Sequence, residues 1–389
     1  MQLLIQSPQT CSSTLGHPWR KTLPSHETLG NIMTTQPKKW IRAEIETLDP
    51  HEDYVRIWQL GACYGANEFI QNLIYALTFP NFVVTEWGSE VVWREDGGKV
   101  VSRANSRVEQ TQAANALWWW YGPHHEKTKK SVEGINRLHA FWAKKYPGAF
   151  AYNEDYVYVC AFTAVSMHRL RLRMGLPGLS EKEQIAAHKF WGEMLKLFRA
   201  ENETPLYGYP EDFAGLIRFC EAMEQEERPK PERGNLITSA IFEQFVSRFF
   251  PPEMHWLGHQ LIRSLSLPST LNTMQIDPPL PMAAEVLPKL MGLVFWHAEM
   301  YEDDPPLSYV EQRESMGAEQ RRGLKEDIEK LDQAFPAHFT ALYGGDARFA
   351  GCPFHTALRQ GTSTPSDDSP IVRDIEEAVV GAIGVANAG

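Results

Sequence analysis

The chain has 389 residues, 43% of them hydrophobic, which is enough to bury the core of one large domain or two smaller ones. Its formal net charge of -11 argues against a nucleic-acid-binding protein, because such proteins carry a basic stripe. Its five cysteines are scattered and form no C-x-x-C pair, which argues against a disulfide framework or a zinc ribbon and favours a reducing compartment.

Residues 1–39 are rich in Ser, Thr, Pro and Gln, and we expect a flexible lead-in. They lack the apolar core of about 7–15 residues that a secretory signal needs. The chain also lacks a run of about 18 apolar residues, so no membrane span is predicted. We therefore expect a cytoplasmic protein.

Helix-start and helix-stop signals divide the rest of the chain. Asp49-Pro50 matches an N-cap and first helical residue, and Ser180 with Glu183 matches a capping box. Without regular strand–helix alternation, these signals predict one all-α domain over residues 40–343, followed by a flexible tail over 344–389. The ranges expected to be helical are 54–79, 82–96, 99–121, 126–145, 153–174, 181–200, a segment from 212, 236–250, 254–265, 281–293, 311–335 and 372–383.

The predicted helix 126–145 carries a histidine on its apolar side. Ile135, Leu138, His139 and Trp142 fall at i, i+3, i+4 and i+7, which is one stripe of a helix. A lone histidine in such a stripe is more often a hydrogen-bonded core residue than a ligand. The alternative is an imidazole that points at a metal held between helices, as the proximal histidine of haem proteins does.

Other metal and nucleotide signals are weak. No histidine follows a glutamate by three positions, as a ferritin-like di-metal site requires. His255 and His259 have i, i+4 spacing but lack the glutamate of the HExxH motif. Phosphate-binding glycine motifs and the GxSxG nucleophile motif are missing from the sequence.

Six short motifs recur in an order that resembles one protein family over roughly residues 50–225. The motifs are Arg107-Val-Glu-Gln-Thr111, Ile135-Asn-Arg-Leu-His139, Asn153-Glu-Asp-Tyr-Val-Tyr158, Arg169–Gly175, Leu179-Ser-Glu-Lys-Glu183 and Phe190-Trp191-Gly-Glu193. The family that they resemble contains rubber oxygenase (latex clearing protein) and the fungal mycophenolate-pathway oxygenase.

The resemblance implies a globin-like, all-α domain that encloses a b-type haem. His139 would be the proximal iron ligand, because the family's ligand lies in an "asparagine, any residue, leucine, histidine" context. Arg107 and Thr111 match the family's distal Arg-x-x-Lys-Thr motif, in which Gln110 replaces the lysine and removes a cation.

Two further positions follow from the same resemblance. The family has a distal glutamate about sixteen residues before the arginine, and Glu90 and Glu95 bracket that spacing. Some members carry a histidine where this chain has Cys160. The aromatic run Trp118–Tyr121 could line an apolar substrate channel, although for any single tryptophan of the run ordinary core packing is the favoured interpretation.

The predicted function is therefore a haem b-dependent oxygenase that cleaves or oxygenates an apolar, alkene-bearing small molecule with O2. The alternative is a non-catalytic haem-binding sensor or carrier, in which His168 or the His255/His259 pair supplies a second iron ligand. A third reading is a helical interaction module without a cofactor.

Overall fold

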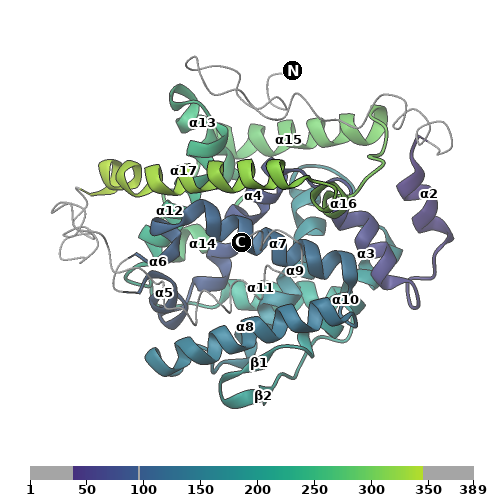
Figure 1. The fold of residues 1–389 in the computed structure, drawn as a ribbon, viewed down its shortest axis with the longest axis horizontal. Helices are drawn as coiled ribbons and strands as arrows, with labels where there is room; N and C mark the ends of the chain where they lie inside the picture. Colours follow the sequence, from purple (N-terminus) through teal and green to yellow (C-terminus); the bar gives the residue numbers. More distant parts are fainter. Residues whose placement is uncertain (1–37, 95–96, 345–389) are drawn as a thin grey trace.

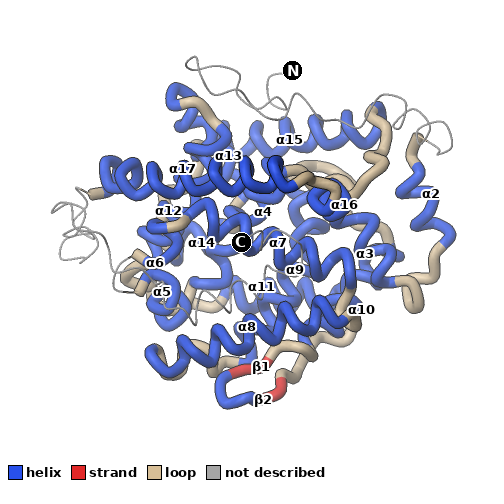
Figure 2. Tube along the Cα trace, in the orientation of Figure 1, coloured by secondary structure: helices blue, strands red, loops and turns tan. Residues whose placement is uncertain are grey.

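The computed structural model describes residues 38–94 and 97–344. The described part is almost entirely helical, with sixteen α-helices and one two-stranded ribbon (Figures 1 and 2), which confirms the all-α prediction. No described helix is long and apolar enough to cross a membrane. The lead-in, the tail and the predicted helix 372–383 lie outside the described residues, apart from the few that border the domain.

The helices are mostly short, and two of the longest cross the domain on opposite sides of its centre in Figure 1, α8 and α17. In chain order the elements are α2 (Trp40–Thr47), α3 (Tyr54–Cys63), α4 (Glu68–Thr78), η3 (Phe79–Val83), α5 (Glu86–Trp93), α6 (Gly98–Ser102), α7 (Ala104–Tyr121), α8 (Glu126–Lys145), α9 (Asn153–Arg173), α10 (Glu181–Leu195), β1 (Arg199–Ala200), η4 (Glu201–Glu203), β2 (Thr204–Pro205), α11 (Phe213–Gln225), α12 (Gly234–Phe249), η5 (Pro252–Met254), α13 (His255–Leu265), α14 (Pro268–Thr273), α15 (Pro281–Tyr301), α16 (Tyr309–Glu314) and α17 (Ala318–Tyr343).

Two large apolar clusters hold these helices together. The first surrounds α12, which is buried all round over residues 234–246, as a helix surrounded by other helices must be. The second joins α7, α9, α10 and α11 and includes Phe190 and Trp191, which are almost completely buried. Smaller clusters around α2 and α3, and around Trp142 of α8, complete the packing.

Several helix ends agree with the sequence signals. Ser180 and Glu183 form the reciprocal capping box that starts α10, and Asp212 caps α11 by accepting from the Gly215 backbone N–H. The range of α8 is the predicted one, so the helix that carries His139 is confirmed.

Other predicted boundaries were wrong. Asp49-Pro50 begins a turn, and α3 starts four residues later with Asp53 as its N-cap residue. The predicted helix 99–121 breaks at Arg103, whose φ of -144° and ψ of 49° are not helical. The predicted helix 311–335 is two helices, α16 and α17, because Ser308 and Gly317 each begin a new one.

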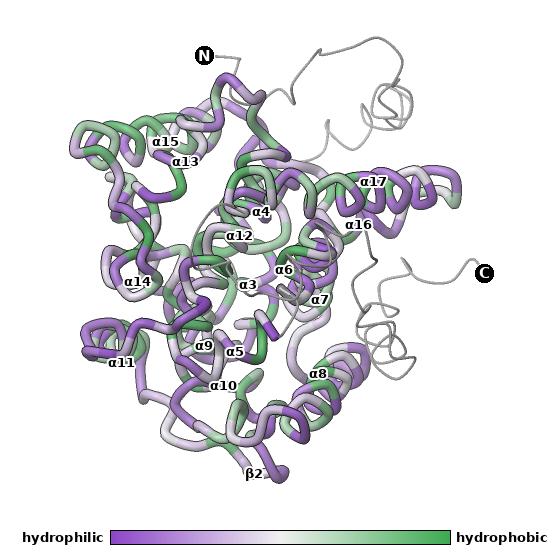
Figure 3. The backbone as a smooth tube through the Cα atoms, turned by 90° about the vertical axis from the view of Figure 1, so that its left-hand side faces the viewer, coloured by the Kyte–Doolittle hydropathy of each residue, from purple (hydrophilic) through white to green (hydrophobic). Residues whose placement is uncertain are grey.

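Helix α15 presents an unusual surface. Its long apolar side chains are largely exposed, and Figure 3 colours much of this helix as hydrophobic. Scattered exposed apolar residues are normal, but a concentration on one helix marks a surface that meets apolar material. The exposed side chains of this group are Leu280, Met282, Val286, Leu290, Leu293, Trp296, Met300 and Tyr301.

Candidate functional site

A cavity of about 3560 Å³ lies where the apolar clusters meet. Its lining includes Tyr75 from the α12-centred cluster, Trp191 from the α10 cluster, Leu60 from the α3 cluster and Trp142 of α8. Small-molecule pockets commonly measure about 300–1,000 Å³, so the cavity has room for more than one such molecule.

His139 of α8 and Arg107 and Thr111 of α7 line this same cavity. His139 lies about thirty positions after Arg107 and Thr111 in the chain, and α7 packs against α8. The three residues that the sequence analysis assigned to one site are therefore neighbours of one cavity. The globin-like enclosure of a haem remains a prediction.

The imidazole of His139 is held on two sides. It stacks on Phe150, with ring centroids 4.4 Å apart and planes 19° apart, and the Tyr156 ring stands edge-on to it at 6.0 Å. Its Nδ1 lies 3.4 Å from the Tyr156 hydroxyl oxygen. Such contacts fix the direction of the ring.

The Tyr156 hydroxyl lies between two groups to which it can hydrogen-bond. It is 3.4 Å from His139 Nδ1 and 3.5 Å from the Phe150 carbonyl oxygen. In the arrangement in which the hydroxyl proton goes to the carbonyl, its oxygen accepts from His139 Nδ1–H and the lone pair of Nε2 is available. Metal-binding histidines are held in the same way, with one ring N–H donated to a protein acceptor and the other nitrogen facing the metal.

Burial lowers the pKa of His139 to about 4. The imidazole is therefore neutral at pH 7, which is the form that ligates iron. Burial likewise raises the pKa of Tyr156, with a further contribution from the Asp155 and Glu201 carboxylates, so its hydroxyl keeps the proton that the arrangement needs.

The pKa shift of His139 predicts a pH-dependent stability of the haem-free protein. Unfolding returns the pKa to about 6.5, so the unfolded chain binds more protons between pH 6.5 and 4 and stability falls as the pH falls. The loss from this one group approaches about 3 kcal/mol at pH 4. Urea unfolding from pH 7 to pH 4 measures it.

The control for this measurement is His139→Phe, which keeps an aromatic ring beside Phe150 but cannot titrate. The difference in unfolding free energy between the two proteins should change across pH 6.5–4. A constant difference would show that His139 titrates normally in the folded state.

Arg107 is positioned by aromatic residues of the preceding elements. Its Nε donates to the Tyr75 hydroxyl at 3.0 Å, and its guanidinium lies 4.5 Å from the centre of the Phe79 ring. The two terminal amino groups make no hydrogen bond to the described residues, so they can bind an anionic or carbonyl oxygen of a ligand.

Thr111 and Gln110 differ in their relation to the cavity. Thr111 lines it, but its hydroxyl donates to the Arg107 carbonyl at 3.0 Å. It can accept a hydrogen bond from a ligand, and it must break this bond before it can donate one. Gln110 lies outside the lining, whereas Gln112 lies within it. Gln110 could therefore affect a bound ligand only through the residues next to it.

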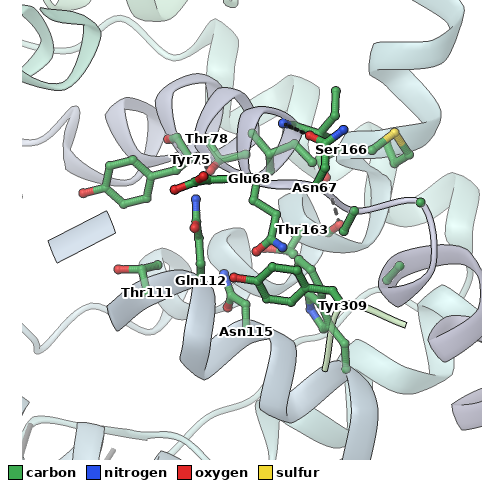
Figure 4. Close-up of a pocket in the computed structure, with 18 of the residues that line it drawn as sticks. Asn67, Glu68, Tyr75, Thr78, Thr111, Gln112, Asn115, Thr163, Ser166 and Tyr309 are labelled. Carbon is green, nitrogen blue, oxygen red and sulfur yellow. Dashed lines mark hydrogen bonds between the residues drawn. The ribbon is translucent and has the colours of Figure 1, made fainter. Parts of the chain in front are cut away.

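One wall of the cavity is polar. Figure 4 shows Glu68 and Tyr75 of α4, with the N-cap residue Asn67, on the side of the cavity that faces Thr111, Gln112 and Asn115 of α7. In both Gln71 and Gln112 the amide nitrogen and oxygen are buried without a hydrogen-bond partner in the described structure. Both side chains are only 4% exposed, and both line the cavity. Because unpaired buried amides are costly, this wall suits a ligand with a hydrogen-bonding group.

The remaining predicted positions are placed as follows. Glu90 is exposed and lies outside the cavity lining, and Glu95 lies outside the described residues. Cys160 is buried and lines the cavity. Burial raises the pKa of its thiol, so Cys160 offers a neutral S–H and not a thiolate. Of the aromatic run, Trp118 and Trp119 line the cavity and the other two residues do not.

The proposed second iron ligands lie elsewhere. His168 accepts a hydrogen bond from the Leu179 N–H at 3.0 Å, and His255 and His259 face Glu243 of α12. His139 is the only histidine among the described residues that line the cavity. The structure therefore does not bring these three histidines to the face opposite His139.

Comparison with models of known protein families gives no match, and comparison with curated proteins gives none either. The resemblance to the rubber oxygenase family accordingly stays a prediction that rests on the motifs. A function is therefore inferred from the geometry of the cavity.

Three residues that the sequence analysis did not assign to the site contribute to it. Phe150 and Tyr156 hold the His139 ring, and Asp155 lines the cavity while accepting from Trp87 Nε1 at 2.8 Å. Burial raises the pKa of Asp155, against the opposing effect of the Trp87 hydrogen bond. The apolar sequence around Phe150 carries no signal for this role. Phe150 follows a Pro-Gly turn, so no helical or strand period predicts the direction of its ring.

Proposed function

We propose that the protein binds haem b through His139 and acts as an oxygenase on an apolar, alkene-bearing small molecule. The observation that carries this proposal is a neutral, oriented imidazole with a free Nε2 in a cavity that also contains Arg107 and Thr111. A histidine of the ordinary core would have no such space beside it.

The residues of the cavity fit a haem group in chemistry and in size. A neutral imidazole is the usual protein ligand of a b-type haem iron. Arg107 offers two unpaired amino groups for a propionate or for a polar ligand atom. The volume of about 3560 Å³ leaves room for a substrate beside a macrocycle.

When bound, haem supplies an iron centre that reacts with O2. The chain itself would contribute three actions. His139 would hold the iron, with its ring fixed by Phe150 and Tyr156. Arg107 would donate hydrogen bonds to a polar or anionic atom of the ligand, and it would need no reorganisation because Tyr75 and Phe79 already hold it. The aromatic walls exclude water from the reacting carbons.

The side chains at the entrance of the cavity favour an apolar substrate. Trp296 and Met300 of α15 both line the cavity and are exposed, at 42% and 55%. They belong to the apolar surface of α15, so a water-insoluble molecule would meet matching side chains outside and inside the entrance.

An oxygenase is preferred over a sensor or carrier for one structural reason. A six-coordinate carrier needs a second strong ligand opposite His139, and the described lining offers no second histidine. The buried Cys160 thiol is protonated and is a poor substitute.

The experiment that tests the function is an absorption spectrum of the full chain purified with haem available, followed by product analysis under ¹⁸O₂. We expect a Soret band at one haem per chain and label in the product of an isoprenoid alkene. A colourless protein that fails to bind added haem would overturn the proposal. A six-coordinate, low-spin spectrum without reactivity toward O2 would support the carrier.

The unpaired amides of the polar wall predict a preference for a substrate with one hydrogen-bonding group. We expect Gln112→Leu to stabilise the ligand-free protein by about 1 kcal/mol, because it removes two unpaired buried polar atoms. The same change should weaken binding of farnesol about tenfold and leave binding of farnesene, which lacks the hydroxyl, unchanged. Chemical unfolding and a fluorescence titration measure the two effects.

Gln184→Leu is the matched control for this variant. The Gln184 amide is already paired, to the Leu179 carbonyl at 2.7 Å, so its loss should destabilise the protein and leave ligand binding as it was. Equal effects on farnesol and farnesene in Gln112→Leu would contradict the assignment of this wall.

A further inference from the structure

A second cluster of ligating side chains lies outside the cavity. It joins Glu243 of α12, His255 and His259 of α13, and His338 of α17. None of these four residues belongs to the cavity lining, so the cluster is distinct from the site around His139. Its three histidines surround a single carboxylate, and this composition calls for an explanation.

Glu243 is the centre of the cluster. Its side chain is 1% exposed. Both of its carboxylate oxygens face imidazole nitrogens, Oε2 that of His259 at 2.9 Å and Oε1 that of His338 at 2.6 Å. A buried carboxylate surrounded by imidazoles is a set of donors that suits a divalent metal ion.

His259 orients this carboxylate without being a ligand itself. Its Nε2 lies 2.9 Å from Glu243 Oε2, and a carboxylate oxygen can only accept, so Nε2 carries the proton. Its Nδ1 is buried without a hydrogen-bond partner among the described residues. His259 therefore holds Oε2 and leaves Oε1 for other groups.

His255 turns a second ring nitrogen toward Oε1. Its Nε2 lies 3.2 Å from the Phe250 carbonyl oxygen, which cannot donate, so this nitrogen is protonated. Its Nδ1 faces Glu243 Oε1 at 3.8 Å. This distance is too long for a hydrogen bond, and an ion placed between the two atoms would be coordinated by both.

His338 completes the set from the other side. Its Nε2 donates to Glu243 Oε1 at 2.6 Å, and an ion bound here would displace this proton. The ligating atoms of His255, His338 and Glu243 all lie within 4.8 Å of one another. A zinc ion with bonds of about 2.0–2.1 Å holds tetrahedral ligands about 3.3 Å apart. Rotations of the two imidazoles that move their nitrogens by about 1 Å reach this spacing.

We propose that Glu243, His255 and His338 bind a divalent transition-metal ion, with Zn²⁺ as the reference ion. Two imidazoles and one carboxylate form the donor set of zinc sites that keep an open position. The Phe250 carbonyl and His259 are the outer partners that orient two of the three ligands, as metal sites require. Because the ligands come from α12, α13 and α17, the ion would tie α17 to the rest of the domain.

The test is an isothermal titration of Zn²⁺ into the chelator-treated full chain in the absence of haem. We expect one ion per chain for the wild type, and at least about tenfold weaker binding for Glu243→Gln and for His338→Gln. His338 is 36% exposed, so its variant tests the site even if Glu243→Gln fails to fold. Cobalt gives a second readout, since coordinated Co²⁺ shows visible bands that these variants should lose.

His297→Gln is the matched control, because His297 also lies 3.9 Å from a carboxylate, that of Glu302, but both are exposed. It should bind Zn²⁺ as the wild type does. Equal affinity of Glu243→Gln and the wild type, or binding that His297→Gln abolishes, would overturn the site. The titration uses no haem, so its result is independent of the function proposed for the cavity.

Discussion

His139→Ala should purify without haem and should lose the oxygenase activity that we propose. The substitution removes the one imidazole that faces the cavity within the described part of the chain, and it leaves Arg107 and Thr111 in place. We expect the affinity for haem to fall by more than about 100-fold, since removing a ligand costs at least as much as removing its outer partners. Haem content per chain and the Soret band measure this loss.

External imidazole should reverse the effect. The alanine leaves a space of imidazole size beside Phe150, in a cavity that small molecules can enter. Added imidazole should therefore restore part of the haem content in His139→Ala and none in a protein that has lost its fold. This rescue separates loss of a ligand from loss of structure.

His168→Ala is the control, because His168 hydrogen-bonds the Leu179 backbone and lies outside the cavity lining. It should keep a full complement of haem. If His139→Ala kept full haem and an unchanged Soret band, His139 would not be the iron ligand. If His168→Ala lost the haem instead, the sensor or carrier with a different ligand set would gain support.

Local sequence signals were sufficient to predict α8, the helix that carries His139. Its apolar stripe and the Tyr146-Pro147-Gly148 stop predicted α8 at its observed bounds. The capping box at Ser180 was predicted for the same reason, since both partners lie three residues apart. Signals of this kind depend only on neighbours in the chain.

Features that depend on packing between distant residues could not be predicted in this way. His338 lies 95 positions from Glu243, so spacing alone could not bring the two together, and the sequence showed only the His255/His259 pair. Gln71 and Gln112 look like ordinary surface residues, and only the packing of α4 and α7 buries them. The break at Arg103 likewise follows from Asp332 of α17, whose carboxylate accepts from the Asn105 and Ser106 N–H groups at the start of α7.

Glu109→Ala should destabilise the protein by about 3–5 kcal/mol. Glu109 of α7 pairs with Arg313 of α16 at 2.5 Å, and the two side chains are 16% and 9% exposed. Arg313 also donates to the Tyr309 hydroxyl through Nε at 2.9 Å and through Nη2 at 2.6 Å. Removing the carboxylate leaves a buried guanidinium without its counter-ion, and that desolvated charge is the source of the loss.

The charged residues near this pair do not compensate for the loss of the Glu109 carboxylate. Arg248 is also buried nearby, and its pKa falls to about 10 because of burial and because of the positive charge of Arg313. Arg248 pairs with Glu68, so Glu68 is not free to replace Glu109. Both arginines line the cavity, and the change should therefore also disturb the cavity wall.

A double variant separates the cost of a broken pair from the value of the intact one. Glu109→Leu with Arg313→Met removes both charges and keeps most of the buried volume, and we expect it to lie within about 1–2 kcal/mol of the wild type or above it. Glu285→Ala, which breaks the exposed Glu285–Lys289 pair, should change stability by less than about 0.5 kcal/mol. Urea unfolding of the four proteins measures these differences. A double variant as unstable as Glu109→Ala would mean that the pair itself, and not the unpaired charge, stabilises the junction of α7 and α16.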